Sequence, residues 1–219
     1  MINLSLKMLA EILGSSPDDL SDAGFQGVTI DSRQSCEGKL FVAIRGANFD
    51  GHNFVDMAYQ NGATAALVEE RQQSEIEQIE VADCKQAMGR LANYWRHCCN
   101  PCVIALTGSN GKTTVKEMLF QILARQATSL ATRGNFNNAI GVPLTRFRLA
   151  QRHDFAIIEM GANHRGEIAR LSQIAEPDFV YVNNVAAAHL GGFGDVRGVM
   201  EAKGELYAYC KSTHRALFN

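Results

Sequence analysis

Short runs of β-branched and apolar residues alternate along this chain with longer segments of helical period. The runs VTIDSR (28–33), KLFVAI (39–44) and AALVEE (65–70) are typical of strands, and a helical segment at 54–60 lies between the last two. Parallel strands need helical crossovers of this kind, so the alternation predicts βαβ units and a mostly parallel sheet flanked by helices. The predicted fold class is α/β.

The same pattern continues beyond residues 70–80, a stretch dense in Glu and Gln that we expect to be a surface segment. We place a domain boundary near residue 82, which gives a small N-terminal α/β domain (1–82) and a second domain (83–219). The second domain is expected to contain a helix at 85–97 ended by Asn100-Pro101, strands at 103–108, 129–132, 155–160 and 179–183, and helices from 112, at 166–174 and at 198–209.

The last residues, RALF (215–218), are typical of one more strand, and the sequence ends one residue beyond them. A natural domain rarely ends at a central strand that nothing covers. We therefore expect the second domain to be truncated and the sequence to be a fragment that lacks a C-terminal domain.

Composition excludes several classes of protein. The net charge of −2 over 219 residues shows no basic excess of the kind that a general nucleic-acid binder carries. The N-terminus lacks the layout of a secretory signal, and no stretch is long enough to insert into a membrane. Six scattered cysteines fit a reducing cytoplasm, and we interpret Cys102, in the run HCCNPC, as a core residue at the head of a strand rather than as a zinc ligand.

The segment VIALTGSNGKTT (103–114) joins a buried-type strand to a helix through a glycine-rich loop. Glycines let successive backbone N–H groups point inward, and the start of a helix adds partial positive charge, so the loop is suited to bind phosphate. Lys112 is placed to reach the β- and γ-phosphates, and the Thr113 hydroxyl to ligate Mg²⁺. The common pattern has a glycine where this chain has Leu106, so the loop is a short form. In the helix, the apolar stripe consists of Val115, Met118, Leu119, Ile122 and Leu123.

The sequence resembles the Mur ligase family of peptidoglycan synthesis, and within it the MurF type. The residues that carry the resemblance are TGSNGKTTVKEM (107–118), GNFNNAIGVPLT (134–145), IIEMGANHRGEI (157–168), NNVAAAHLGGFG (183–194), EAKGE (201–205), DSR (31–33) and FVAIRGANFDGHNF (41–54). The resemblance implies an ATP-dependent ligase that forms an amide bond. The γ-phosphate activates the terminal carboxylate of UDP-N-acetylmuramoyl-tripeptide as an acyl phosphate, and the amine of D-alanyl-D-alanine attacks it.

The resemblance also implies a set of site residues. The nucleotide-binding residues are Thr107, Gly108, Ser109, Asn110, Gly111, Lys112, Thr113 and Thr114, and Asn137 and Asn138 join them or form a plain turn. Two Mg²⁺ ions are expected, with Thr113 and Glu159 at the first, His189 at the second, and Lys203 as a further ligand if its amine is carbamylated. Lys112, Glu159, His189 and Lys203 are the expected catalytic residues.

Substrate contacts are implied in both domains. Asn163, His164 and Arg165 lie between a strand and a helix, where Arg165 could bind an anionic group of the substrate. Ser32 and Arg33, with the loop 45–52 that ends at His52, are expected to bind the UDP end. The partners are then these two substrates, with no nucleic acid and no membrane, and we expect a monomer.

Three alternatives stay open from sequence. A sister ligase, either the one that adds the third amino acid or a folylpolyglutamate synthase, shares the phosphate loop. The chain as given could bind nucleotide without ligation, because closure of a further domain supplies catalytic groups and excludes water. An unrelated P-loop NTPase would hydrolyse the nucleotide with no peptide substrate.

Overall fold

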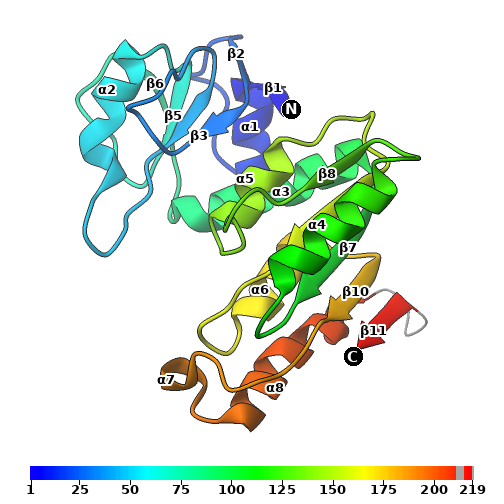
Figure 1. Ribbon diagram of the computed structural model, residues 1–219. Helices are drawn as coiled ribbons and strands as arrows, with labels where there is room; N and C mark the ends of the chain where they lie inside the picture. Colours follow the sequence, from blue (N-terminus) through cyan, green and yellow to red (C-terminus); the bar gives the residue numbers. More distant parts are fainter. Residues whose placement is uncertain (211–214, 219) are drawn as a thin grey trace. The chain divides into compact units, whose positions relative to one another are not determined.

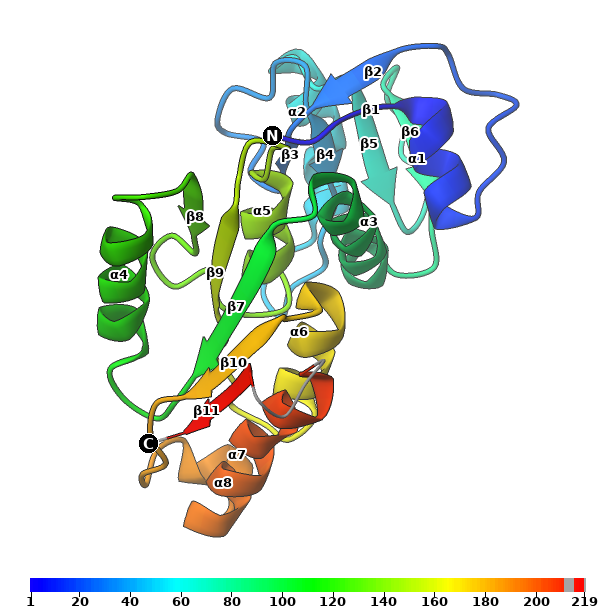
Figure 2. The ribbon, with the colours of Figure 1, turned by 90° about the vertical axis from the view of Figure 1, so that its right-hand side faces the viewer.

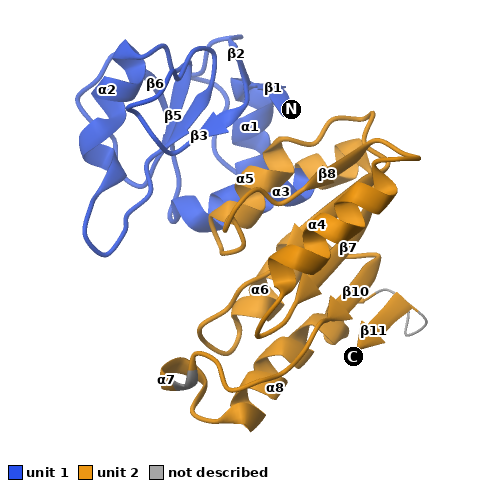
Figure 3. Cartoon of the chain, in the orientation of Figure 1, with its two compact units in different colours: residues 1–94 blue, residues 95–219 orange. Residues whose placement is uncertain are grey.

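The computed structural model describes residues 1–210 and 215–218. The chain divides into two compact units, Met1–Tyr94 and Trp95–Asn219 (Figure 3), and the division falls inside helix α3 (Cys84–Cys99). The boundary that we expect near residue 82 lies just before this helix and stays a prediction. No described helix combines the length and the apolar character needed to cross a membrane.

The first unit is built on a parallel sheet of four short strands in the order β3-β4-β5-β6. These are β3 (Val28–Thr29), β4 (Leu40–Val42), β5 (Ala65–Val68) and β6 (Glu77–Glu80), and all the residues of β4 and β5 are buried. The crossover from β4 to β5 runs through the 3₁₀ turn η1 (Gly51–Phe54) and α2 (Val55–Gln60). A separate antiparallel pair is formed by β1 (Asn3–Ser5) and β2 (Gly24–Gln26), and α1 (Leu6–Leu13) lies between these strands in sequence.

The polar stretch 70–80 is not purely a surface segment, and this part of the sequence prediction is wrong. Its last four residues form β6, in which Gln78 and Ile79 are buried. The Gln78 amide can be buried because it accepts a hydrogen bond from Gln72 N–H at 2.8 Å and donates one to Gln72 O at 2.9 Å. A polar side chain whose donor and acceptor are both hydrogen-bonded costs little free energy to bury. The polar composition of this stretch therefore did not indicate the strand that it contains.

The second unit is built on a parallel sheet whose described strands have the order β11-β10-β7-β9-β8. They are β7 (Cys102–Thr107), β8 (Ser129–Ala131), β9 (Phe155–Glu159), β10 (Phe179–Val182) and β11 (Ala216–Phe218). In the register of this sheet, Thr107 of β7 lies beside Val182, and Glu159 lies beside Leu106. The carboxyl ends of three strands therefore meet at one edge, which is where parallel sheets bind ligands. The expected α/β class is confirmed, and the expected last strand is present as β11, which pairs with β10.

Helices cover both faces of this sheet (Figures 1 and 2). Helix α4 (Lys112–Leu123) packs against β8 and β9 on one face, while α5 (Gly141–Phe147) and α6 (Glu167–Ala175) lie on the other. The chain then passes through α7 (Leu190–Phe193), α8 (Val196–Gly204) and the 3₁₀ turn η2 (Glu205–Tyr209), which packs against α6.

The apolar stripe expected on α4 is only partly turned inward. Met118 and Ile122 are 59% and 65% exposed, whereas the fully buried residue of this helix is Lys116. Lys116 can be buried because its Nζ donates to Thr132 O at 2.7 Å and lies 2.8 Å from a carboxylate oxygen of Glu117. The residue of α4 that is fully buried is therefore a lysine with hydrogen-bonding partners, and a search for apolar residues at helical spacing does not find it.

Helix α5 is an element that the sequence reading missed. The Asn138 carboxamide oxygen accepts hydrogen bonds from Ile140 N–H and Gly141 N–H, which starts the helix. Pro143 lies in the first turn, where a missing N–H removes no helical hydrogen bond. The motif GVPLT therefore forms a short helix rather than a continuation of the preceding loop.

Candidate active site

The glycine-rich loop lies between the end of β7 at Thr107 and the start of α4 at Lys112. Gly111 precedes the helix with φ of 71°, a conformation that favours glycine, and no side chain caps the helix there. The first N–H groups of α4 therefore face the loop together with the positive end of the helix dipole. Lys112 Nζ donates to Gly108 O at 2.8 Å, so the lysine folds back over the loop.

The position where the common phosphate-loop pattern has a glycine is occupied here by Leu106. This residue is fully buried and still pairs within β7, opposite Glu159 of β9. The strand therefore continues through Leu106 to Thr107 and the loop begins later, which explains the short form in physical terms.

A buried carboxylate faces the start of α4 from the neighbouring strand. Glu159, the last residue of β9, is 1% exposed and accepts a hydrogen bond from Thr113 Oγ1 at 3.0 Å through its Oε2. Its Oε1 accepts from Asn137 Nδ2 at 2.8 Å, and its backbone N–H donates to Thr132 Oγ1 at 3.0 Å. The structure thus brings Thr113, Asn137 and Glu159 together, while Asn138 caps α5 instead.

The residues around Glu159 fit a divalent cation. A carboxylate and a hydroxyl oxygen lie 3.0 Å apart beside a phosphate-binding loop, and Mg²⁺ prefers oxygen ligands of this type. In the part of the chain that is described, no cluster of three or more His, Cys, Asp or Glu residues is arranged for a metal ion. The expected site does not need such a cluster, since Thr113 and Lys203 make up half of its predicted ligands.

Lys203 lies in the last turn of α8 and is 2% exposed. Burial, and secondarily the charge of Lys112, lower the pKa of the Lys203 ammonium from its ordinary value to about 8. Its Nζ lies 5.9 Å from the centre of the Phe193 ring. These surroundings raise the fraction of neutral amine, the form that reacts with CO₂, above that of an exposed lysine.

Other predicted residues are engaged differently. His189 is exposed and has a left-handed backbone with φ of 54°, and within the described residues no hydrogen bond joins it to Glu159 or Lys203. Arg165 forms an ion pair with Glu201 at 2.9 Å, and the Asn163 N–H donates to a Glu167 carboxylate oxygen at 2.7 Å. The loop 161–166 is thus ordered by carboxylates from α6 and α8.

The first unit contains a cavity of about 500 Å³. Its lining combines aromatic, sulfur-bearing and polar side chains: Ile30, Asp31, Ser32, Arg33, Phe41, Phe49, Gly51, Phe54 and Met57. Arg33 forms two hydrogen bonds to the carboxylate of Asp31, and these bonds hold the pKa of that carboxyl at about 2. Ser32 and Arg33 are therefore brought together at a cavity, and their binding of the UDP end stays a prediction.

His52 does not line this cavity. It is buried, its Nδ1 lies 2.6 Å from an Asp50 carboxylate oxygen, and its Nε2 accepts a hydrogen bond from Glu69 N–H at 2.8 Å. Both ring nitrogens are therefore occupied within the unit, and His52 holds the loop 45–52 against the end of β5. A direct contact between His52 and substrate stays a prediction.

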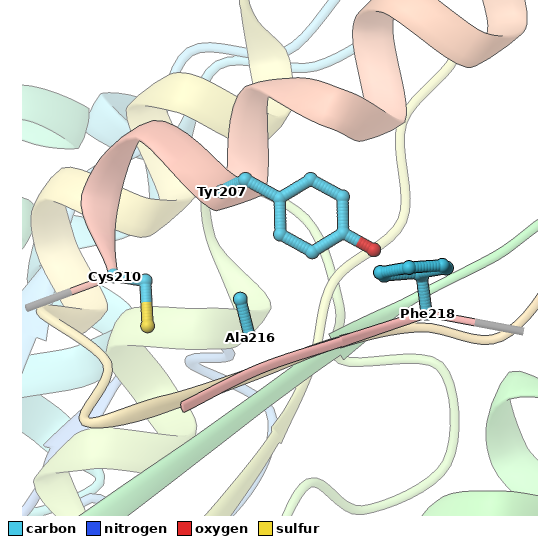
Figure 4. Close-up of a pocket in the computed structure, with 4 residues that line it drawn as sticks. All are labelled: Tyr207, Cys210, Ala216 and Phe218. Carbon is cyan, nitrogen blue, oxygen red and sulfur yellow. The ribbon is translucent and has the colours of Figure 1, made fainter. Parts of the chain in front are cut away.

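A second cavity, of about 400 Å³, lies between η2 and β11 (Figure 4). It is lined by Tyr207, Cys210, Ala216 and Phe218, and the Tyr207 hydroxyl already donates to Leu217 O at 3.0 Å. The described lining has no charged side chain, and its polar groups are the Tyr207 hydroxyl and the Cys210 thiol.

Sequence reasoning missed several residues that shape the site. Asn183 and Asn184 hydrogen-bond to the glycine-rich loop, and Lys116 fixes the strand end that contacts Glu159. Phe49, Phe54 and Met57 line the cavity of the first unit. The two asparagines could have been found from their position, because they directly follow β10 and so lie at the same edge of the sheet as the loop.

Comparison with known families gives the identity of the two units. Residues 106–219 match the Mur ligase middle domain, and residues 24–96 match the domain described as Mur ligase family, catalytic domain. The chain belongs to the Mur ligase family. The resemblance found in the sequence is thereby confirmed.

Individual relatives agree on the type of Mur ligase. The chain is 44% identical, over its whole length, to the UDP-N-acetylmuramoyl-tripeptide--D-alanyl-D-alanine ligase of Escherichia coli, of which it covers 48%. A crystal structure of MurF from Acinetobacter baumannii matches all of the chain with a TM-score of 0.94 at 39% identity, and 49% of that protein is covered. The MurF ligase of Thermotoga maritima, crystallised in complex with ADP, matches 88% of the chain with a TM-score of 0.82 at 34% identity, and 45% of it is covered. This Mur ligase chain thus spans about half the length of the relatives that it matches.

Proposed function

We propose that this chain supplies the UDP-substrate-binding and ATP-binding parts of a ligase that adds D-alanyl-D-alanine to UDP-N-acetylmuramoyl-tripeptide. The observation that carries the proposal is the pairing of Thr113 with the buried Glu159 beside a phosphate loop, in a chain 44% identical to a ligase of that name. ATP would be the phosphoryl donor, which is consistent with the ADP complex of the Thermotoga maritima relative.

We assign roles to the residues from the geometry of the loop and of Glu159 together with the family resemblance. The N–H groups at the start of α4 and the ammonium of Lys112 would bind the phosphates, and Thr107 to Thr114 would form the cradle. Thr113 and Glu159 would hold one Mg²⁺, with His189 and Lys203 serving a second. Mg²⁺ would neutralise charge that accumulates on the transferring phosphoryl group.

Lys203 is proposed to act as a carbamate. Its neutral amine would form an N–C bond to CO₂ and release a proton, which turns a buried cation into an anion with two oxygens. The lowered pKa of Lys203, about 8, and its burial support this chemistry, because a fully charged exposed lysine reacts poorly.

The cavity of the first unit is proposed to take the uridine end of the substrate. Phe49 and Phe54 offer aromatic faces for a base, and Ser32 and Arg33 offer donors for its phosphates and sugar. Asn163 and Arg165, on the loop after β9, would contact an anionic part of the tripeptide, with Arg165 exchanging Glu201 for the substrate. We further propose a monomer that acts in the cytoplasm, where ATP is available.

The decisive test is phosphate release by the natural gene product that contains this sequence. Release should require ATP, UDP-N-acetylmuramoyl-tripeptide and D-alanyl-D-alanine together, and E159Q should abolish it. The control variant E11Q alters an exposed carboxylate on α1 of the first unit and should retain activity. Release driven by a diamino acid or by glutamate instead would assign the chain to a sister ligase and refute the proposal.

The isolated chain is proposed to bind nucleotide with negligible ligation. It covers about half of its relatives, and closure of a further domain commonly excludes water and completes a catalytic site. Robust addition of D-alanyl-D-alanine by residues 1–219 alone would contradict this.

A further inference from the structure

The segment that follows β10 runs alongside the glycine-rich loop and is hydrogen-bonded to it. Asn183 N–H donates to Thr107 O at 2.8 Å, and Ser109 N–H donates to Asn184 O at 3.0 Å. The Ser109 hydroxyl donates to Ala186 O at 3.0 Å and accepts from Ala186 N–H at 2.9 Å. The two segments are 77 residues apart in sequence at this last contact, yet they are joined like neighbouring strands.

The exposed tip of the loop is held by two side-chain amides. Asn184 Oδ1 accepts a hydrogen bond from Asn110 N–H at 2.9 Å, and Asn184 Nδ2 donates to Asn110 O at 3.0 Å. Asn183 Nδ2 donates to the same Asn110 O at 2.7 Å. Asn184 therefore engages both backbone groups of one residue, which fixes the orientation of the peptide planes on either side of it.

The two glycines of the loop are also explained by this neighbour. A Cβ atom at Gly108 would lie 2.9 Å from the Asn183 Cβ, and one at Gly111 would lie 3.0 Å from Asn183 Nδ2. Glycine at these positions thus allows close approach of Asn183, in addition to the positive φ that Gly111 adopts.

These contacts decide which amides can bind phosphate. The N–H groups of Ser109 and Asn110 point toward Asn184, so the amides in the first turn of α4 are those directed at a phosphate in the loop. A loop without the support of Asn184 would sample other peptide orientations and would lose part of this directed array.

We propose that Asn184, supported by Asn183, is a positioning residue that holds Ser109–Asn110–Gly111 in the phosphate-binding shape. The same contacts couple nucleotide binding to the segment that leads from Asn184 to His189. This inference rests on the proposed binding of ATP in the glycine-rich loop and adds the residues that order the loop.

The test measures the Kd of Mg²⁺–ADP by calorimetry on the 219-residue chain. Asn184→Ala removes both side-chain hydrogen bonds to Asn110, and we expect the Kd to rise about tenfold with little change in Tm. The matched control Tyr181→Phe removes a hydrogen bond to Asn183 Oδ1 and leaves every contact with the loop intact, so its Kd should stay within about twofold of the wild type. A Kd for Asn184→Ala equal to that of the wild type would overturn the proposal.

Hydrogen exchange of the wild-type chain gives a second readout that does not depend on the folding of any variant. Mg²⁺–ADP should slow amide exchange in residues 183–186 as well as in the loop, while β8 serves as the internal reference. Slowed exchange confined to the loop would refute the coupling. Failure of the wild type to bind Mg²⁺–ADP would instead refute the proposed nucleotide site itself, so the two failures are distinguishable.

Discussion

Replacement of Arg96 by methionine tests how the second unit is held together at the amino ends of its strands. The Arg96 side chain is 2% exposed and forms an ion pair with Asp178 at 3.1 Å, and its guanidinium also donates to Asn100 Oδ1 at 3.0 Å. Asp178 accepts a further hydrogen bond from Val103 N–H at 2.9 Å. The pair therefore ties the end of α3 to the starts of β7 and β10.

The expected loss can be worked from this geometry. Breaking a buried ion pair by removing one partner costs roughly 3–5 kcal/mol, because the other charge stays buried without compensation. Asp178 keeps its bond to Val103 N–H and is 16% exposed, so we expect Arg96→Met to lower the free energy of unfolding by about 3 kcal/mol, the lower end of that range. The double variant Arg96→Met/Asp178→Asn should lose less than the sum of the single losses, by roughly 1–2 kcal/mol.

Urea denaturation followed by tryptophan fluorescence is a suitable assay. Trp95 is the single tryptophan of the chain and donates to Leu149 O within the second unit, so its emission reports on that unit. The control Arg197→Met removes an exposed ion pair with Glu201 and should cost about 0.3–0.5 kcal/mol. A loss below about 1 kcal/mol for Arg96→Met, or strict additivity in the cycle, would show that the pair does not act as a buried unit.

Three further predictions concern the loops and the two sites. Gly141→Ala places a Cβ atom 2.3 Å from the Phe136 carbonyl carbon and should destabilise the second unit by about 1–3 kcal/mol. At Gly204 a Cβ atom would have nothing within 4 Å, so Gly204→Ala should stabilise the unit by about 0.5–1 kcal/mol. Thermal unfolding temperatures that shift in the same direction for both variants would contradict this prediction. Asn137→Ala removes the side chain that donates a hydrogen bond to Glu159 Oε1. We expect nucleotide binding to weaken about tenfold in the presence of Mg²⁺ and much less in its absence. An equal loss of affinity under both conditions would argue that Asn137 does not act through Glu159. Burial raises the pKa of Asp50, but hydrogen bonds from His52 and Arg45 outweigh it and leave that pKa at about 2, below its ordinary value of 3.8. The stability that this carboxylate contributes is therefore fully present above about pH 4 and lost as the pH falls toward 2; Asp50→Asn should flatten this part of the acid-unfolding curve of the first unit, and an unchanged curve would refute the assignment.

Local sequence patterns determined the α/β class, the glycine-rich loop between a strand and a helix, and the position of Glu159 at the end of a strand. Each of these depends on a short window: β-branched runs, glycines beside a lysine, and a carboxylate that follows FAII. Backbone preferences act over the same short distances, so such features can be read from sequence. The family resemblance then supplied roles for Lys203 and His189 that no local pattern contains.

Tertiary structure alone decided how the segments meet. The burial of Lys116 depends on Thr132, the burial of Gln78 on Gln72, and the shape of the phosphate loop on Asn184, which lies 74 residues from Asn110. A polar residue is predicted to be exposed when no hydrogen-bonding partner is adjacent in sequence. It can be buried, or can hold a loop, only when the fold brings such a partner within hydrogen-bonding distance. The sequence by itself therefore predicted which loop would bind phosphate, and only the packing of β10 beside β7 determined which asparagines hydrogen-bond to that loop.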